Sequence, residues 1–148
     1  MAELVADAKR NCMVGRLLLR VRYAETDRMG IAYNGHYLTW FEVGRTELMR
    51  SAGFPYRSVE ERGINLPLVE ATLRLRAPVG YDDVITIETW IAQLRSRVIV
   101  FSYVIYHDGR SVAEGTTTHA CVDAKTNRAV AMPVWLGEQV DRLRRVSS

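Results

Sequence analysis

The chain has 148 residues, 48% of them hydrophobic and 25% charged, which is typical of one soluble globular domain with a core of useful size. Its formal net charge is only +3, and it lacks the dense basic stripe with interleaved aromatic residues that marks a nucleic-acid-binding protein. No apolar run is long enough to cross a bilayer, and the N-terminal segment has no continuous apolar core of a secretory signal.

The first half of the domain is predicted to be a strand followed by a long helix. We expect residues 1–14 to form a flexible leader and residues 15–148 to form one domain. Alternating apolar residues predict a strand over 16–23, and residues 24–33 are expected to form a loop. Asn34 is expected to cap, through its side-chain oxygen, a helix that continues to about residue 52.

This predicted helix carries an unusually broad apolar face, with apolar residues three and four positions apart from Tyr37 to Ala52. Gly44 lies in its middle, where a glycine weakens a helix. Either another segment packs closely against Gly44, or the helix tolerates a weak position. Glu42 and Glu47 lie on the polar side, where arginines three residues away are suitable ion-pair partners.

After a short helix predicted over 57–62, the pattern changes to strands. These are predicted over residues 66–77, 84–94, 97–107 and 110–122. Asp108-Gly109 is a strong hairpin signal, and Pro133 is expected to begin a last helix that ends near residue 143. Consecutive hairpins predict an antiparallel meander of about five strands, one face of which the long apolar helix covers. The fold class is therefore α+β.

The cysteines and histidines show none of the spacings that hold a metal ion. Cys12 and Cys121 lack metal-ligand or CxxC spacing, so we expect two reduced thiols in a cytoplasmic protein, with no structural disulfide. His36, His107 and His119 are scattered along the chain, which argues against a zinc site. His119 lies on a predicted strand and is expected to be a partly buried structural residue.

Two carboxylates, Glu25 and Asp27, lie in the loop just before the long helix. The first N–H groups of a helix have no partner within the helix, and the helix dipole is positive there. A carboxylate facing such donors suggests hydrolysis of an activated acyl group. Alternatively, Asp27 is only a turn residue. Glu25 is expected to be solvated, or else to bond the loop backbone.

A longer motif extends over this loop and the helix start, Tyr23-x-Glu25-Thr26-Asp27-x-Met29-Gly30-x-x-Tyr33-x-x-x-Tyr37. Further along stand Phe41-Glu42-x-x-Arg45-Thr46-Glu47, Pro78-x-x-Tyr81-Asp82-Asp83 and Ala120-Cys121-Val122-Asp123. With these motifs in this order, the chain resembles the hotdog-fold acyl-CoA thioesterases from about residue 16 to residue 133. The resemblance is greatest to the 4-hydroxybenzoyl-CoA thioesterase-like branch, which includes the thioesterases associated with the Tol-Pal system.

The resemblance implies a single hotdog domain, in which the sheet wraps around one central helix. It implies a homodimer or homotetramer with active sites at the subunit interface, and hydrolysis of a fatty-acyl-CoA or aryl-CoA thioester without metal or organic cofactor. Asp27 matches the catalytic carboxylate, as nucleophile or general base. Asn34 matches the helix-start residue whose backbone N–H polarises the thioester carbonyl. Family members carry His or an aromatic residue there, which favours a role for the backbone.

Residues around the helix start are the predicted substrate-binding residues, namely Tyr23, Tyr33, Gly35, His36 and Tyr37. Packing against the helix explains Tyr23 and Tyr33 equally well. The candidate cations for the phosphates of CoA are Arg95, Arg97, Lys125 and Arg128. Two alternatives stay open: a thioesterase that acts on acyl carrier protein, and a hotdog-fold protein that binds acyl-CoA without turnover.

Overall fold

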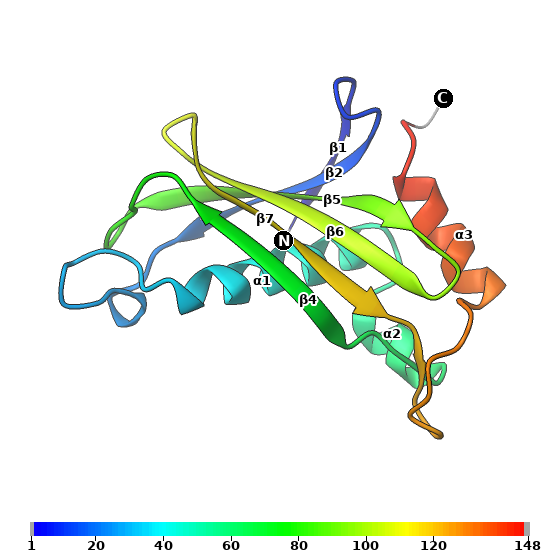
Figure 1. Ribbon diagram of the computed structural model, residues 1–148. Helices are drawn as coiled ribbons and strands as arrows, with labels where there is room; N and C mark the ends of the chain where they lie inside the picture. Colours follow the sequence, from blue (N-terminus) through cyan, green and yellow to red (C-terminus); the bar gives the residue numbers. More distant parts are fainter. Residues whose placement is uncertain (1, 147–148) are drawn as a thin grey trace.

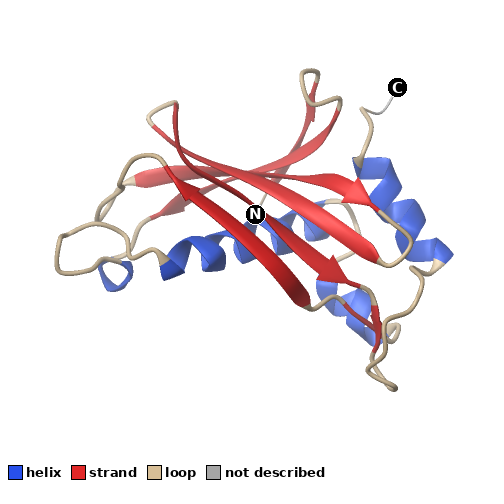
Figure 2. Ribbon diagram, viewed as in Figure 1, coloured by secondary structure: helices blue, strands red, loops and turns tan. Residues whose placement is uncertain are grey.

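The computed structural model describes residues 2–146 and shows a sheet packed on one long helix (Figure 1; Figure 2). Its strands are β1 (Glu3–Asp7), β2 (Cys12–Arg20), β3 (Ile64–Asn65), β4 (Leu68–Leu75), β5 (Val84–Leu94), β6 (Val98–His107), β7 (Arg110–Ala120) and β8 (Val122–Asp123). Its helices are the 3-10 turn η1 (Tyr23–Glu25), α1 (Gly35–Ser51), α2 (Tyr56–Glu61) and α3 (Val134–Leu143). The predicted α+β class is confirmed.

The main sheet has six antiparallel strands in the order β1-β2-β5-β6-β7-β4, and β3 pairs with β8 in a separate two-stranded sheet. The predicted count of about five strands is therefore slightly low. The meander holds only for β5, β6 and β7. Strand β4 pairs with β7, with Leu68 opposite His119, rather than with the next strand along the chain. Alternating apolar residues predict a strand but not the strand it pairs with. The pairing of β4 with β7 was therefore not predicted from the sequence.

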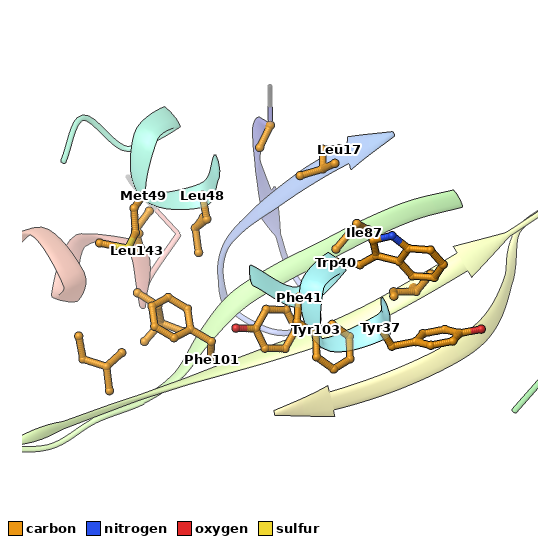
Figure 3. Close-up of a cluster of buried hydrophobic side chains, with 14 of the residues drawn as sticks. Leu17, Tyr37, Trp40, Phe41, Leu48, Met49, Ile87, Phe101, Tyr103 and Leu143 are labelled. Carbon is orange, nitrogen blue, oxygen red and sulfur yellow. The ribbon is translucent and has the colours of Figure 1, made fainter. Parts of the chain in front are cut away.

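Helix α1 lies against one face of the sheet, and the strands curve around it (Figure 1). Trp40, Phe41 and Leu48 are almost completely buried between helix and sheet. The ring of Phe41 stacks on that of Tyr103 from β6, with centroids 4.3 Å apart and planes 10° apart (Figure 3). The apolar face read from the sequence is therefore the face that builds the core.

Gly44 lies where α1 approaches β5 most closely. A Cβ atom added to Gly44 would lie 2.4 Å from Oγ1 of Thr89 and 2.9 Å from a methyl carbon of Ile87. Both distances are too short for real contacts, so only glycine fits at this position. The close-packing explanation of this mid-helix glycine is confirmed.

The N-terminal segment is an ordered hairpin, so the prediction of a flexible leader over residues 1–14 is wrong for the described residues 2–14. Strands β1 and β2 pair with Val5 opposite Val14. In the turn between them, the Arg10 guanidinium lies 3.9 Å from the centre of the Trp90 ring and pairs with Glu88 at 2.9 Å. These partners lie about eighty residues away in sequence, so the local pattern gave no sign of them.

Several element ends also differ from the prediction. The strand predicted over 16–23 ends at Arg20, and the chain then forms the turn η1. Pro133 precedes the first turn of α3 instead of lying in it. The helix predicted from Asn34 to about residue 52 is α1, and the strand predicted over 84–94 has the bounds of β5. None of the helices within residues 2–146 is both long enough and apolar enough to cross a membrane.

Candidate active site

Asp27 lies in a tight loop whose two sides pair with each other. An antiparallel bridge between Thr26 and Ala32 closes the loop. Inside it, the Asp27 N–H donates to the Ile31 carbonyl at 2.8 Å, and the Gly30 N–H donates to the Asp27 carbonyl at 3.0 Å. Gly30 has a φ of +78°, a left-handed conformation that suits glycine. The main chain therefore fixes the position of Asp27.

The Asp27 carboxylate is half-buried, and the loop uses only one of its oxygens. Oδ1 accepts a 2.8 Å hydrogen bond from the N–H of Met29, a contact typical of an Asx turn. Over residues 2–146, Oδ2 has no hydrogen-bond donor. Asp27 is thus a turn residue, as one interpretation of the sequence held, and its second oxygen is free to meet a water molecule or a substrate.

Glu25 anchors this loop to the helix and is not the solvated carboxylate that the sequence suggested. Its exposed fraction is only 4%. Oε1 accepts from the backbone N–H of Arg22 at 2.8 Å, and Oε2 accepts from the indole N–H of Trp40 at 2.9 Å. The alternative of a bond to the loop backbone is confirmed. The link to Trp40 was missed, because fifteen residues and a change of element separate the pair.

The environment of Glu25 keeps this buried carboxyl ionised. Burial acts to raise its pKa, but hydrogen bonds from the Arg22 backbone and Trp40, with the charge of Arg22, lower the pKa below its usual value. In addition, the Glu25 carbonyl accepts a 2.9 Å hydrogen bond from the N–H of Tyr33. Glu25 therefore holds both ends of the loop that carries Asp27.

The start of α1 offers free backbone donors at the same end of the helix as this loop (Figure 1). The N–H groups of His36 and Tyr37 donate back to the carbonyls of Tyr33 and Asn34. In the part of the chain that the structure describes, the N–H groups of Asn34 and Gly35 have no acceptor. Free donors at the positive end of a helix suit an oxygen that develops negative charge.

The side chain of Asn34 does not cap the helix, so the predicted capping bond is wrong. Asn34 has helical backbone angles, φ −57° and ψ −32°, and makes no side-chain cap bond. A capping residue needs an extended backbone to turn its side chain toward the N–H groups one turn on. The backbone role predicted for Asn34 is untouched by this correction and stays a prediction.

The predicted substrate-binding residues divide into exposed and buried ones. Tyr23 and Tyr33 are 78% and 53% exposed. Tyr33 lies over the first turn of α1, against Gly35 and the ring of His36. Tyr23 contacts the ring edge of Tyr81, with centroids 5.8 Å apart. Helix packing therefore explains Tyr33 in part, whereas Tyr23 points an aromatic ring toward solvent.

Tyr37 belongs to the interior and lines a cavity beside the loop. Its ring packs on Trp40 with centroids 4.8 Å apart (Figure 3). The cavity has a volume of about 290 Å³ and opens between the loop, the start of α1 and the end of β4. The lining residues are Ile31, Ala32, Tyr37, Leu75, Arg76, Ala77 and Pro78. This mostly apolar space lies beside the first turn of α1, to which Tyr37 belongs.

The four candidate cations for CoA do not gather near Asp27 in this chain. Arg95 and Arg97 lie in the turn between β5 and β6, and Lys125 and Arg128 follow β8. Both turns are exposed and lie at the other end of α1 from the Asp27 loop (Figure 1). The β5–β6 turn contacts the segment that leads into β8, since the Cys121 N–H donates to the Arg97 carbonyl at 2.9 Å. Their role in binding CoA stays a prediction.

His119 is more deeply buried than the sequence suggested, with an exposed fraction of 1%. Its Nδ1 bonds the Leu66 carbonyl and its Nε2 bonds Thr117 Oγ1, both at 2.9 Å. Burial, helped by the charge of Arg45, lowers the pKa of His119 to about 4, so the ring is neutral at pH 7. The predicted structural role fits this environment.

The structure shows two buried cysteines, Cys12 and Cys121, both as free thiols. Within residues 2–146, no three His, Cys, Asp or Glu side chains lie close enough together to hold a metal ion. The chemical groups that the site does present are one carboxylate oxygen and two backbone N–H donors. The carboxylate can activate a nucleophile, and the N–H donors can stabilise an oxyanion.

Comparison with known proteins agrees with this geometry. A profile described as the thioesterase-like superfamily matches residues 21–140. The chain belongs to the thioesterase-like superfamily. This membership confirms the family and the thioester-hydrolase class predicted from the motifs, whereas the association with the Tol-Pal system stays a prediction.

Individual relatives support the same assignment. "Putative acyl-CoA thioesterase YneP" from Bacillus subtilis is 36% identical over 127 residues, which cover 82% of this chain and 92% of YneP. Among solved structures, the Thermus thermophilus protein TT1821 has 36% identity and a TM-score of 0.83, over 86% of this chain and 98% of that chain. The DHNA-CoA thioesterase from Staphylococcus aureus has 27% identity and a TM-score of 0.81, over 87% of each chain. The hotdog fold is confirmed.

Proposed function

We propose that this protein hydrolyses the thioester of a fatty-acyl-CoA or aryl-CoA to the free acid and CoA. The observation that carries the proposal is the arrangement at the start of α1. There the free oxygen of Asp27 belongs to the loop that precedes the helix, and the unbonded N–H groups of Asn34 and Gly35 belong to the helix start. Relatives that are named acyl-CoA thioesterases, such as YneP, support the substrate class.

The chemistry follows from these groups. The thioester carbonyl oxygen accepts hydrogen bonds from the helix-start N–H groups, which stabilise the negative charge of the tetrahedral intermediate. As a general base, Asp27 takes a proton from the attacking water, the C–S bond breaks, and the proton passes to the departing CoA thiolate. As a nucleophile, Asp27 forms an anhydride and releases CoA thiolate, and water then hydrolyses the anhydride.

An assembly of at least two subunits is part of the proposal. Strand β4 forms an edge of the sheet and pairs only with β7 within the described chain. Leu68, Val69 and Leu75 on this edge are 50%, 60% and 50% exposed. An open apolar edge of this kind favours pairing with another chain. Because Arg95 and Arg97 lie far from Asp27 in one chain, they would reach a CoA molecule only from a partner subunit.

Two other functions use the same site. A thioesterase for acyl carrier protein would prefer the protein-bound thioester to the free CoA ester, and a binding protein would hold acyl-CoA without hydrolysis. The proposal places the enzyme in the cytoplasm, where the free thiols Cys12 and Cys121 stay reduced.

The test is thiol release from a panel of acyl-CoA and aryl-CoA esters by the wild type and by Asp27→Asn. We expect the substitution to lower kcat by about 10²-fold or more while the fold and oligomer size stay the same. Asp123→Asn is a matched control, because Asp123 accepts the same kind of turn bonds from Lys125 and Thr126 but lies at the other end of the domain. A substrate-free blank corrects for thiol reagent that labels the cysteines.

Equal rates in the wild type and Asp27→Asn would remove Asp27 from catalysis. No turnover of any CoA ester by the wild type would exclude the proposed substrate class. Repeating the assay with acyl carrier protein thioesters would then separate the carrier-protein enzyme from the binding protein.

A further inference from the structure

A second cavity lies along α1, on the side of the helix that faces β4 and β7. Its volume is about 360 Å³. Both apolar and polar side chains line it. The residues that matter for the argument are Leu38, Glu42, Arg45, Met49, Leu66 and His119. Because Leu38 belongs to the first turn of α1, the cavity begins close to the free donors of the helix start.

A chain of hydrogen bonds forms the polar side of this cavity, and its direction can be assigned. A carbonyl only accepts, so Nδ1 of His119 carries the proton that bonds the Leu66 carbonyl, and Nε2 is the acceptor. The Thr117 hydroxyl therefore donates to Nε2 of His119. The Tyr103 hydroxyl, 2.5 Å from Thr117 Oγ1, then donates to that oxygen. Tyr103 is left to accept, and Arg45 donates to it at 3.4 Å.

This chain of hydrogen bonds leaves one strong hydrogen-bond donor, the guanidinium of Arg45, without a charged partner. Arg45 is half-buried, and its single hydrogen bond in the described chain is the long one to the neutral Tyr103 hydroxyl. Its guanidinium carbon lies 6.0 Å from the centre of the Phe101 ring, a weak cation–π contact. No carboxylate of the described residues forms an ion pair with it, although Glu42 lines the same cavity.

The charges that face the cavity are therefore Arg45 and Glu42, with His119 neutral at pH 7. Glu42 is exposed at the helix surface, whereas Arg45 lies deeper and contacts the buried Tyr103. A half-buried cation without a carboxylate partner favours a ligand that brings one, since guanidinium binds carboxylate through paired hydrogen bonds.

We propose that this cavity receives the far end of the substrate's acyl group and that Arg45 binds a carboxylate there. The preferred substrate is then an acyl-CoA whose acyl group has an apolar middle and a carboxylate at the end opposite the thioester. This inference rests on the proposed thioesterase function, and it names Arg45 as the residue that determines specificity.

The spacing along α1 sets the distance that such a substrate must span. Arg45 lies eleven residues beyond Asn34, which corresponds to about 16 Å along a helix axis at about 1.5 Å per residue. Leu38, Met49 and Leu66 provide apolar walls for the methylene groups. The thioester carbonyl stays at the helix start while the carboxylate reaches the guanidinium.

The experiment compares kcat/KM for matched pairs of esters of equal chain length. Octanoyl-CoA is set against suberoyl-CoA, and dodecanoyl-CoA against dodecanedioyl-CoA, for the wild type, Arg45→Met, Arg45→Lys and Arg50→Met. Arg50 is the control, because it lies on the same helix, pairs with Glu47 and is absent from the cavity wall. Circular dichroism and the oligomer size are measured for each variant.

We expect the wild type to favour the carboxylate-ended ester of at least one pair by about tenfold or more. Arg45→Met loses this preference, Arg45→Lys keeps part of it, and Arg50→Met keeps all of it. Preference of the wild type for the methyl-ended esters, or an equal effect of Arg45→Met on both members of each pair, overturns the inference. Dissociation of the assembly in Arg45→Met also overturns it, because Arg45 would then bind the partner subunit.

Failure of the proposed function is distinguishable from failure of this inference. If the wild type hydrolyses none of the esters, thioesterase activity toward these CoA esters is what fails. The affinities for suberoyl-CoA and octanoyl-CoA, measured by calorimetry, then test whether Arg45 binds the terminal carboxylate. Tighter binding of suberoyl-CoA that Arg45→Met abolishes supports the inference, and equal binding of the two esters overturns it.

Discussion

The indole N–H of Trp40 donates a 2.9 Å hydrogen bond to the buried carboxylate of Glu25, and this bond ties the Asp27 loop to α1. Trp40 also packs in the core between helix and sheet. The position of the proposed catalytic carboxylate therefore depends on a core residue of the helix.

Replacing Trp40 by phenylalanine tests this link. Trp40→Phe leaves one oxygen of Glu25 without its buried donor, which we expect to lower the free energy of unfolding by about 1–3 kcal/mol. It also loosens the loop, so kcat/KM for acyl-CoA hydrolysis should decrease by about tenfold or more. Denaturant unfolding and steady-state kinetics measure the two effects.

Trp135→Phe is the control for this substitution. Trp135 is half-buried in α3 and stacks with the guanidinium of Arg62, 3.8 Å from its ring centre, away from the Asp27 loop. Trp135→Phe should lower the free energy of unfolding and leave kcat/KM unchanged. If Trp40→Phe hydrolyses acyl-CoA as fast as the wild type, the Glu25–Trp40 bond does not position Asp27.

The buried His119 gives the protein a predictable dependence on pH. Its pKa in the folded chain is about 4, below the ordinary value of about 6.5, so the unfolded chain binds a proton first as the pH falls. The stabilisation is therefore complete above about pH 6.5 and decreases between about pH 6.5 and pH 4, by up to about 3 kcal/mol.

Urea unfolding of the wild type and His119→Gln at pH 7, 6 and 5 measures this effect. We expect His119→Gln to be less stable at pH 7, because it loses the bonds to Leu66 and Thr117. The difference between the two proteins should become smaller as the pH falls. A difference that stays constant from pH 7 to pH 5 would contradict the neutral buried histidine.

The contact between Gly44 and Thr89 predicts an unusual response to alanine. In an exposed helix, glycine to alanine adds about 1 kcal/mol of stability. In Gly44→Ala the new methyl group would meet Thr89 and Ile87, so we expect a net loss of about 1–3 kcal/mol. Thermal or denaturant unfolding gives the change.

Gly137→Ala is the matched control, because Gly137 lies in α3 and an added Cβ there meets no atom within 4 Å. This variant should be as stable as the wild type or more stable. An unchanged or raised stability of Gly44→Ala would show that α1 can move away from β5.

The N-terminal hairpin predicts that the first residues contribute to stability. Deleting residues 2–11 removes β1 and the contacts of Arg10 with Glu88 and Trp90, and it uncovers an edge of β2. We expect the free energy of unfolding to decrease by about 2 kcal/mol or more. Arg10→Gln, which keeps the strand, should show a smaller decrease. A truncated chain as stable as the full chain would support the flexible leader instead.

Local chemistry was enough to find most elements and the loop of the site. The bounds of β5 follow from alternating apolar residues, and α1 from apolar residues three and four positions apart. The turn Asp108-Gly109 adopts φ values of 50° and 77°, as its two residues favour. Asp27, Gly30 and the free donors of the helix start also lie within a few residues of one another, so a short motif marks them.

The sequence by itself therefore determined the fold class, the family motifs and the place of Asp27 before a helix start. Only the tertiary structure decided which distant residues meet: β4 with β7, Glu25 with Trp40, Arg10 with Trp90, and Arg45 with Tyr103. The physical reason is the range of each interaction. Backbone propensity and periodicity act between near neighbours in the chain, whereas burial of a charge and its pairing depend on the packing of the whole domain.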